Sequence, residues 1–181
     1  MWRTTEDITD HYDRMSVIGF DQDGLEPFAG AGHWNDPDML EVGNGGMNHD
    51  EYITHMSLWV LLAAPLLAGN DLSKMNQETL DILTNKEVIA VDQDAKGVQG
   101  RRIAQEGPLE VWAKPLADGS VAVGLFNRSE STNPITVNLK DVGARSSVHL
   151  RDLWQHKDLG SFTGSYTGDV PRHGVILLKI Q

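Results

Sequence analysis

The change in sequence texture near Gly97 most constrains how this chain folds. Before it, segments with helical spacing alternate with short apolar runs, and after it short runs rich in Val, Ile and Leu are separated by turn residues. The first pattern is typical of an α/β fold and the second of an antiparallel β-sandwich. We therefore expect two architectures, α/β and then all-β, in a chain of 181 residues. This length exceeds one average domain but falls short of two comfortable ones.

The strongest helix signal in the first half follows Asn48. Asn48 and Glu51 have the spacing of a capping box, with Asn in the usual Ser or Thr place. The run that follows is apolar on one face and later nearly all round, and we expect Pro65 to end the helix. Weaker signals predict further helices at 10–19, 77–83 and 86–91, a short strand at 30–34 and a buried parallel strand at 66–69.

The second half reads as a series of strands. Runs that favour strands lie at 109–114, 120–127, 134–139, 147–154 and 174–180. Several alternate apolar and polar residues, and turn signals such as Asn133-Pro134 lie between them. Five or more strands at this spacing predict an antiparallel sandwich. We place the boundary near residues 94–100, which gives an α/β domain at 1–97 and a sandwich at 98–181.

The charge is uneven along the chain. Residues 1–97 carry 18 Asp and Glu against 5 Lys and Arg, a net charge of −13, and residues 98–181 carry 8 against 10, a net of +2. An acidic surface repels phosphate backbones, so we expect no nucleic-acid partner. No apolar run reaches the ~18 residues of a membrane span, and the N-terminus lacks the pattern of a signal peptide. The chain has no Cys, which excludes disulfides and thiolate metal sites.

The stretch from Gly32 to Leu40 is dense in polar groups and follows a predicted strand. Asp36 and Asp38 flank a proline, so the backbone there is extended and does not enter a helix at once. Asp38 and Met39 are then expected at the carboxyl end of the strand, where α/β barrels carry their chemistry. A carboxylate grips sugar hydroxyls, and a thioether or aromatic group covers the apolar sugar face. The alternative is that either Asp only caps the turn that follows.

A second group of polar residues opens the chain. On a helical turn Arg3 and Asp7 would share a face, with Glu6 nearby. Taken alone, this pattern is equally typical of a surface salt bridge with a helix cap.

Other candidate motifs carry no function. His49 and His55 are six residues apart, without the spacing of a zinc protease, so we interpret both as ordinary polar positions on or near a helix. The glycine-rich stretch 43–46 has neither the lysine of a phosphate-binding loop nor dinucleotide-binding spacing. We expect no metal and no cofactor.

Taken together, the motifs closely resemble glycoside hydrolase family 27, the α-galactosidases and α-N-acetylgalactosaminidases. The residues that carry the resemblance are, in order, WRTTxDI, GxWNDPDMLEVGNGGM, SLWVLLAAPLLAGNDL, ILTNKEVIAVDQD and GVQGRR. The resemblance is dense over residues 2–102 and looser in the sandwich. It implies a (β/α)8 barrel followed by a β-sandwich, and points to a secreted or periplasmic enzyme, although the sequence itself leaves the compartment open.

The resemblance also assigns roles. Asp7 matches the acid/base of a retaining mechanism, Arg3 matches a sugar-contacting arginine four residues before it, and Asp38 and Met39 match the pair that lines the pocket after strand seven. The family's nucleophile is an Asp in a Lys-x-Asp segment after strand four, and this sequence contains no such segment. A barrel needs about 200–250 residues. We therefore expect the C-terminal part of a barrel, about strands 6–8 with their helices, and the whole sandwich.

These observations leave three hypotheses about function. The first is a retaining α-galactosidase that removes terminal α-linked galactose from oligosaccharides, present as a C-terminal portion that is inactive alone. The second is a non-catalytic sugar-binding or interaction module, for which Trp112 and Trp154 would form an aromatic platform on the sandwich. The third is a half-barrel that associates through its open edges with another copy or with a separate N-terminal half.

Overall fold

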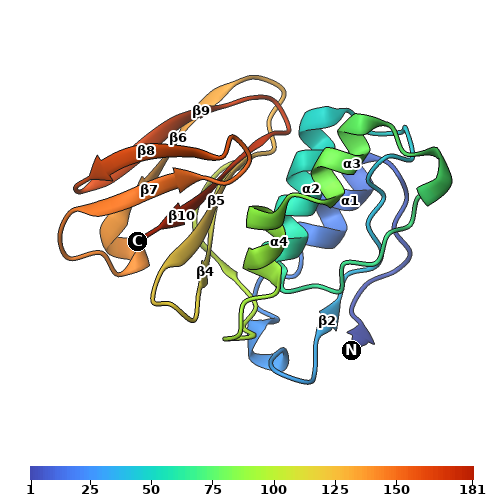
Figure 1. Cartoon of the computed structure of the whole chain (residues 1–181), viewed down its shortest axis with the longest axis horizontal. Helices are drawn as coiled ribbons and strands as arrows, with labels where there is room; N and C mark the ends of the chain where they lie inside the picture. The colour runs from blue at the N-terminus through green and yellow to red at the C-terminus, as the bar shows by residue number, and fades with distance from the viewer.

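The computed structural model describes residues 1–181 and has two differently built parts, which lie side by side in Figure 1. The first is mainly helical. Its elements are β1 (Trp2–Arg3), α1 (Tyr12–Phe20), a 3-10 turn (Glu26–Phe28), β2 (Asn35–Asp36), α2 (His49–Leu62), a second 3-10 turn (Leu72–Lys74), α3 (Gln77–Leu83) and α4 (Lys86–Asp92). None of these helices combines the length and the apolar character that a membrane crossing requires.

The capping box predicted for α2 is confirmed. The side chain of Asn48 accepts from the Glu51 backbone N–H, and the Glu51 carboxylate accepts from that of Asn48. The helix ends before Pro65, because Ala63 adopts the left-handed conformation with φ 52° and Ala64 precedes a proline. Asn76 caps α3 as predicted by accepting from the Thr79 N–H.

Three short segments lie parallel in the first part. β1 pairs with β2, with Trp2 opposite Asn35 and Arg3 opposite Asp36, so this strand lies just after the predicted 30–34. Residues 66–69 also run parallel to their neighbour, through a single bridge between Leu40 and Ala68. The prediction that this segment is buried was wrong. Ala68 is exposed, because no other strand of this chain pairs along its outer edge.

The second part is an antiparallel sandwich. Its strands are β3 (Arg101–Glu106), β4 (Leu109–Pro115), β5 (Val121–Asn127), β6 (Asn133–Asn138), β7 (Val148–Asp152), β8 (Lys157–Phe162), β9 (Ser165–Val170) and β10 (Val175–Ile180). A six-stranded sheet has the order β3-β4-β5-β10-β7-β8, and a 3-10 turn (Leu139–Val142) follows β6, which pairs with β9. The sequence pattern identified β4, β5, β6, β7 and β10. It missed β3 and β8, which are edge strands with polar sequences, and β9, which alternates exposed and half-buried residues.

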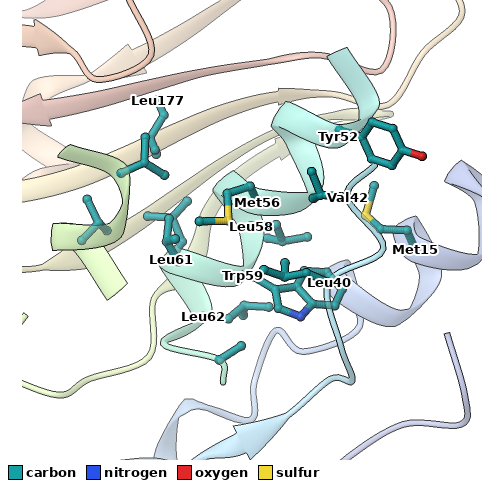
Figure 2. Close-up of a cluster of buried hydrophobic side chains, with 14 of the residues drawn as sticks. Met15, Leu40, Val42, Tyr52, Met56, Leu58, Trp59, Leu61, Leu62 and Leu177 are labelled. Carbon is teal, nitrogen blue, oxygen red and sulfur yellow. The ribbon is translucent and has the colours of Figure 1, made fainter. Parts of the chain in front are cut away.

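Two hydrophobic clusters cover opposite faces of the six-stranded sheet. A cluster of 11 buried residues fills the space between this sheet and the β6-β9 pair. The larger cluster, of 25 buried residues, joins the other face to the helices and includes Trp59, Trp112, Phe126 and Leu177. In Figure 2, Leu61 of α2 lies on the side of Leu177, whereas Met15 lies on the opposite side of the helix. α2 is therefore apolar nearly all round because it packs on both sides.

Candidate functional site

The pairing of β1 with β2 brings together two segments that are more than 30 residues apart in the sequence. After the strand pair ends, the Thr4 backbone N–H continues the ladder with a 3.0 Å hydrogen bond to the carbonyl of Asp36. The residues that follow each strand therefore emerge at one edge, which is where α/β barrels place their functional groups. The polar residues predicted from both segments meet there.

Arg3 joins the two segments by contacting a carboxylate of each. Its Nη2 lies 3.3 Å from Oδ1 of Asp7 and 2.8 Å from Oδ2 of Asp38. The expected helical turn through residues 3–7 is absent, because Arg3 belongs to β1 and helix α1 begins only at Tyr12. The contact between Arg3 and Asp7 nevertheless forms, through a bend that folds the chain back.

The carboxylate of Asp38 is fixed from several directions. Oδ2 accepts from the Ile8 N–H at 2.9 Å, and Oδ1 accepts from the Met39 N–H at 2.8 Å. The capping role that competed with a site role belongs to Asp36, whose Oδ1 accepts from the Asp38 N–H at 3.0 Å. The two aspartates that flank Pro37 thus have different roles. Asp36 shapes the turn, and Asp38 holds the guanidinium of Arg3.

The groups of this site differ in exposure. The side chain of Asp7 is 96% exposed and that of Asp38 is 11% exposed, while Met39 as a residue is 39% exposed. They form an open face and not a pocket. A cavity of about 980 Å³ lies elsewhere, between α2, α3, α4 and the turn at Trp154. Because the polar side chains converge on the open face, we place the candidate site there.

Behind this face, two side chains of α2 contact the loop that carries Asp38. The indole N–H of Trp59 donates to the Asp38 carbonyl at 2.8 Å, and the Glu41 N–H donates to Nε2 of His55 at 3.0 Å. The interpretation of His55 as an ordinary polar position was wrong. It is fully buried, and burial lowers its pKa to about 3. His49, by contrast, is an exposed helix residue whose Nδ1 lies 2.6 Å from a carboxylate oxygen of Glu78.

Chemically, the face offers two carboxylates and one guanidinium. Carboxylates accept hydrogen bonds from hydroxyl groups and a guanidinium donates to them, and the exposed side chain of Asp7 is accessible to a molecule bound at this face. The structure contains no cluster of three or more His, Cys, Asp or Glu side chains that would hold a metal ion.

Comparison with protein families identifies both parts of the chain. Residues 1–94 match the family described as alpha galactosidase A, and residues 106–180 match the alpha galactosidase C-terminal beta sandwich domain.

Individual relatives agree with this result. Alpha-galactosidase 2 of Arabidopsis thaliana is 51% identical over 157 residues, which cover 86% of this chain and 40% of the relative. The crystal structure of alpha-galactosidase I from Mortierella vinacea superposes with a TM-score of 0.93 at 34% identity, covering 99% of this chain and 52% of that one. A β-L-arabinopyranosidase of the same glycoside hydrolase family from Geobacillus stearothermophilus has a TM-score of 0.92 at 34% identity, covering 100% and 44% of the two chains.

The chain spans 40 to 50% of the length of the curated α-galactosidases that it matches. The matched part contains the end of the barrel, with its parallel segments at β1, β2 and residues 66–69, and the sandwich. The chain therefore belongs to glycoside hydrolase family 27, the family of the α-galactosidases, and corresponds to the C-terminal portion of its members.

Proposed function

We propose that this chain carries the acid/base and part of the sugar-binding face of a retaining α-galactosidase that removes terminal α-linked galactose from oligosaccharides. The observation that carries the proposal is the position of Arg3, which contacts Asp7 and Asp38 at once. This arrangement places the carboxyl group of Asp7, which we assign to proton transfer, close to the carboxylate of Asp38, which we assign to binding sugar hydroxyls. Relatives that are named α-galactosidases support the choice of substrate class.

In this mechanism Asp7 acts twice. As a carboxylic acid it gives its proton to the glycosidic oxygen while the bond from that oxygen to the anomeric carbon breaks and a nucleophilic carboxylate, which this chain does not supply, bonds to that carbon. As a carboxylate it then takes a proton from the water that attacks the anomeric carbon, which breaks the bond to that nucleophile and releases the sugar. The 96% exposure of its side chain leaves it open to both the leaving group and the water.

Arg3, Asp38 and Met39 orient the sugar in the proposed site. Arg3 donates hydrogen bonds to hydroxyl oxygens, and Asp38 accepts from hydroxyl groups through the lone pairs that its protein partners leave free. The exposed thioether of Met39 covers an apolar patch of the ring. Because the sequence has no Lys-x-Asp segment for a nucleophile, we propose that the chain binds the sugar without hydrolysing it.

A titration with galactose, followed in ¹H–¹⁵N NMR spectra, tests this proposal. We expect shifts at the amides of Asp7, Asp38 and Met39, and we expect Asp38→Asn to abolish them because it removes the charge that holds Arg3. Asp169→Asn is the matched control, since Asp169 is exposed in β9, within the sandwich. Shifts confined to the sandwich, or none at all, would contradict the proposal.

The sugar-binding module remains a second candidate, but its predicted aromatic platform has little support. Trp112 is fully buried in the larger hydrophobic cluster. Trp154 packs against the same cluster and donates its indole N–H to Ser57 Oγ at 2.8 Å. Trp112 cannot stack on a sugar, and the half-buried indole of Trp154 is already bound to Ser57, so we favour the site at Asp7 and Asp38.

A further inference from the structure

We propose that His55 and Trp59 are positioning residues, which hold the loop after β2 so that the carboxylate of Asp38 faces Arg3. The inference deepens the proposed function and rests on it for the role of Asp38.

The backbone of Asp38 is in a conformation that it would not choose alone. Its φ is +91°, a region that side chains with a Cβ rarely occupy and that persists only when surrounding groups enforce it. This conformation determines where the carboxylate points. Its oxygens meet the Arg3 guanidinium and the Ile8 and Met39 amides only while it is kept.

Two hydrogen bonds from α2 hold the loop, one at the carbonyl of Asp38 and one at the amide of Glu41. Trp59 holds the Asp38 carbonyl at 2.8 Å, and His55 holds the Glu41 amide at 3.0 Å. One anchor binds an oxygen and the other an N–H, so together they fix both the position and the direction of the backbone between them. Because His55 and Trp59 are four residues apart on one helix, both project from the same face toward the loop.

The two rings are packed in the interior of the molecule. Both residues are fully buried, and their ring planes are perpendicular with centroids 4.1 Å apart. Figure 2 shows the indole of Trp59 beside Leu40, its nitrogen pointing away from the body of α2. The anchors therefore derive their rigidity from the core of the molecule.

The chemistry of His55 indicates a specific task and not simple packing. Its Nε2 accepts a hydrogen bond, so the proton of the neutral ring lies on Nδ1, and Nδ1 has no partner. A buried polar atom without a partner destabilises the fold. An apolar side chain would fill the same space without that cost, but it would leave the Glu41 amide unbound.

Amide hydrogen exchange and NMR shifts of Ile8 and Met39 test the inference, because both amides donate to Asp38. In Trp59→Phe and in His55→Leu, we expect both proton shifts to move and exchange at Ile8 to accelerate by about tenfold, the factor that matches one lost hydrogen bond. His55→Gln places an acceptor at the position of Nε2 and is expected to restore the wild-type values. Val60→Ala is the control, since it truncates a buried residue of α2 whose side chain makes no polar contact.

The outcomes separate positioning from stability. If Val60→Ala moves the Ile8 and Met39 amides as much as Trp59→Phe does, or if His55→Gln behaves like His55→Leu, the two rings serve packing alone and the inference is overturned. Galactose added to the wild-type chain tests the proposed function separately. Failure of that titration would remove the sugar role of Asp38 while the amide readout still decides whether α2 positions it.

Discussion

The role of a single residue in this chain depends more on its contacts in the fold than on its residue type. The site roles of Asp38 and Met39 came from the family resemblance, because their local motif, a proline between aspartates, predicts only that the backbone does not enter a helix at once. The burial of His55 and its contact with Glu41 were not predictable, because both depend on the loop at Glu41 folding back over α2. A polar residue in an apolar helix gives no sign of which distant backbone group it binds.

Asn127 illustrates the same point and supports a prediction. The side-chain amide of this buried residue donates to the carbonyls of Ser131, Val170 and Pro171, at 2.7 to 3.1 Å. We expect Asn127→Ala to lower the free energy of unfolding by about 2 kcal/mol, because buried carbonyls lose their donor. Urea denaturation measures the change. Asn138→Ala, at an exposed position of β6, is the control, and an equal effect of both substitutions would refute this explanation.

At the scale of elements, local signals predicted more than long-range ones. Helices with an Asn cap were found correctly because the cap and its N–H partner lie within one turn. Edge strands such as β3 and β8 were missed, because pairing with a neighbour, and not a continuous apolar pattern, makes them strands.

Contacts between elements of the two parts support a second prediction. Glu87 of α4 accepts from Arg151 of β7 at 2.6 and 2.7 Å, and these hydrogen bonds, followed by that of His156, lower the pKa of Glu87 to about 2. The pKa in the unfolded chain is near 4.5. The contact therefore stabilises the fold fully above pH 4.5, and its contribution is lost as the pH falls toward 2.

We expect Glu87→Gln to lower the free energy of unfolding by about 1 kcal/mol at pH 7, a value that allows for partial exposure of the pair. The difference from wild type should shrink as the pH is lowered from 4.5 to 2. Thermal unfolding across this range measures it. Glu106→Gln, at an exposed position in β3, should leave the profile unchanged, and a difference that persists at pH 2 would rule out the ion pair as its cause.

A single large hydrophobic core joins the two parts of the molecule, although their sequence patterns differ. We keep residues 97 and 98 as a proposed division of the chain, but the larger hydrophobic cluster crosses it and joins α2 to β4, β5 and β10. The two architectures were predictable from sequence, since each has its own periodicity. Their packing was not, because residues such as Trp59 and Leu177 meet only through the tertiary fold.

This shared core predicts cooperative unfolding. We expect a single transition when the chain is followed by far-ultraviolet circular dichroism and by Trp fluorescence. Leu177→Ala should lower its midpoint by removing about 3 kcal/mol, since Leu177 is fully buried between the sheet and the helices. Two separate transitions would show that the parts fold independently.

The open edge of the barrel part supports a prediction about association. Residues 66–69 are paired on one side only, and a largely apolar groove of about 400 Å³ runs between Leu40, Leu66 and Leu72. Bare parallel edges invite further pairing. We expect this chain to self-associate with rising concentration in light scattering, and a clean monomer at every concentration would contradict that expectation.

The central claim is that residues around Arg3 form a sugar-binding face that lacks its nucleophile. Crystals of this chain soaked with a nitrophenyl α-galactoside test it most directly. We predict an intact glycoside whose galactose contacts Arg3, Asp38 and Met39 and whose glycosidic oxygen faces Asp7, with no nitrophenol released. A sugar bound on the sandwich, or appreciable release of nitrophenol by the pure chain, would contradict the account.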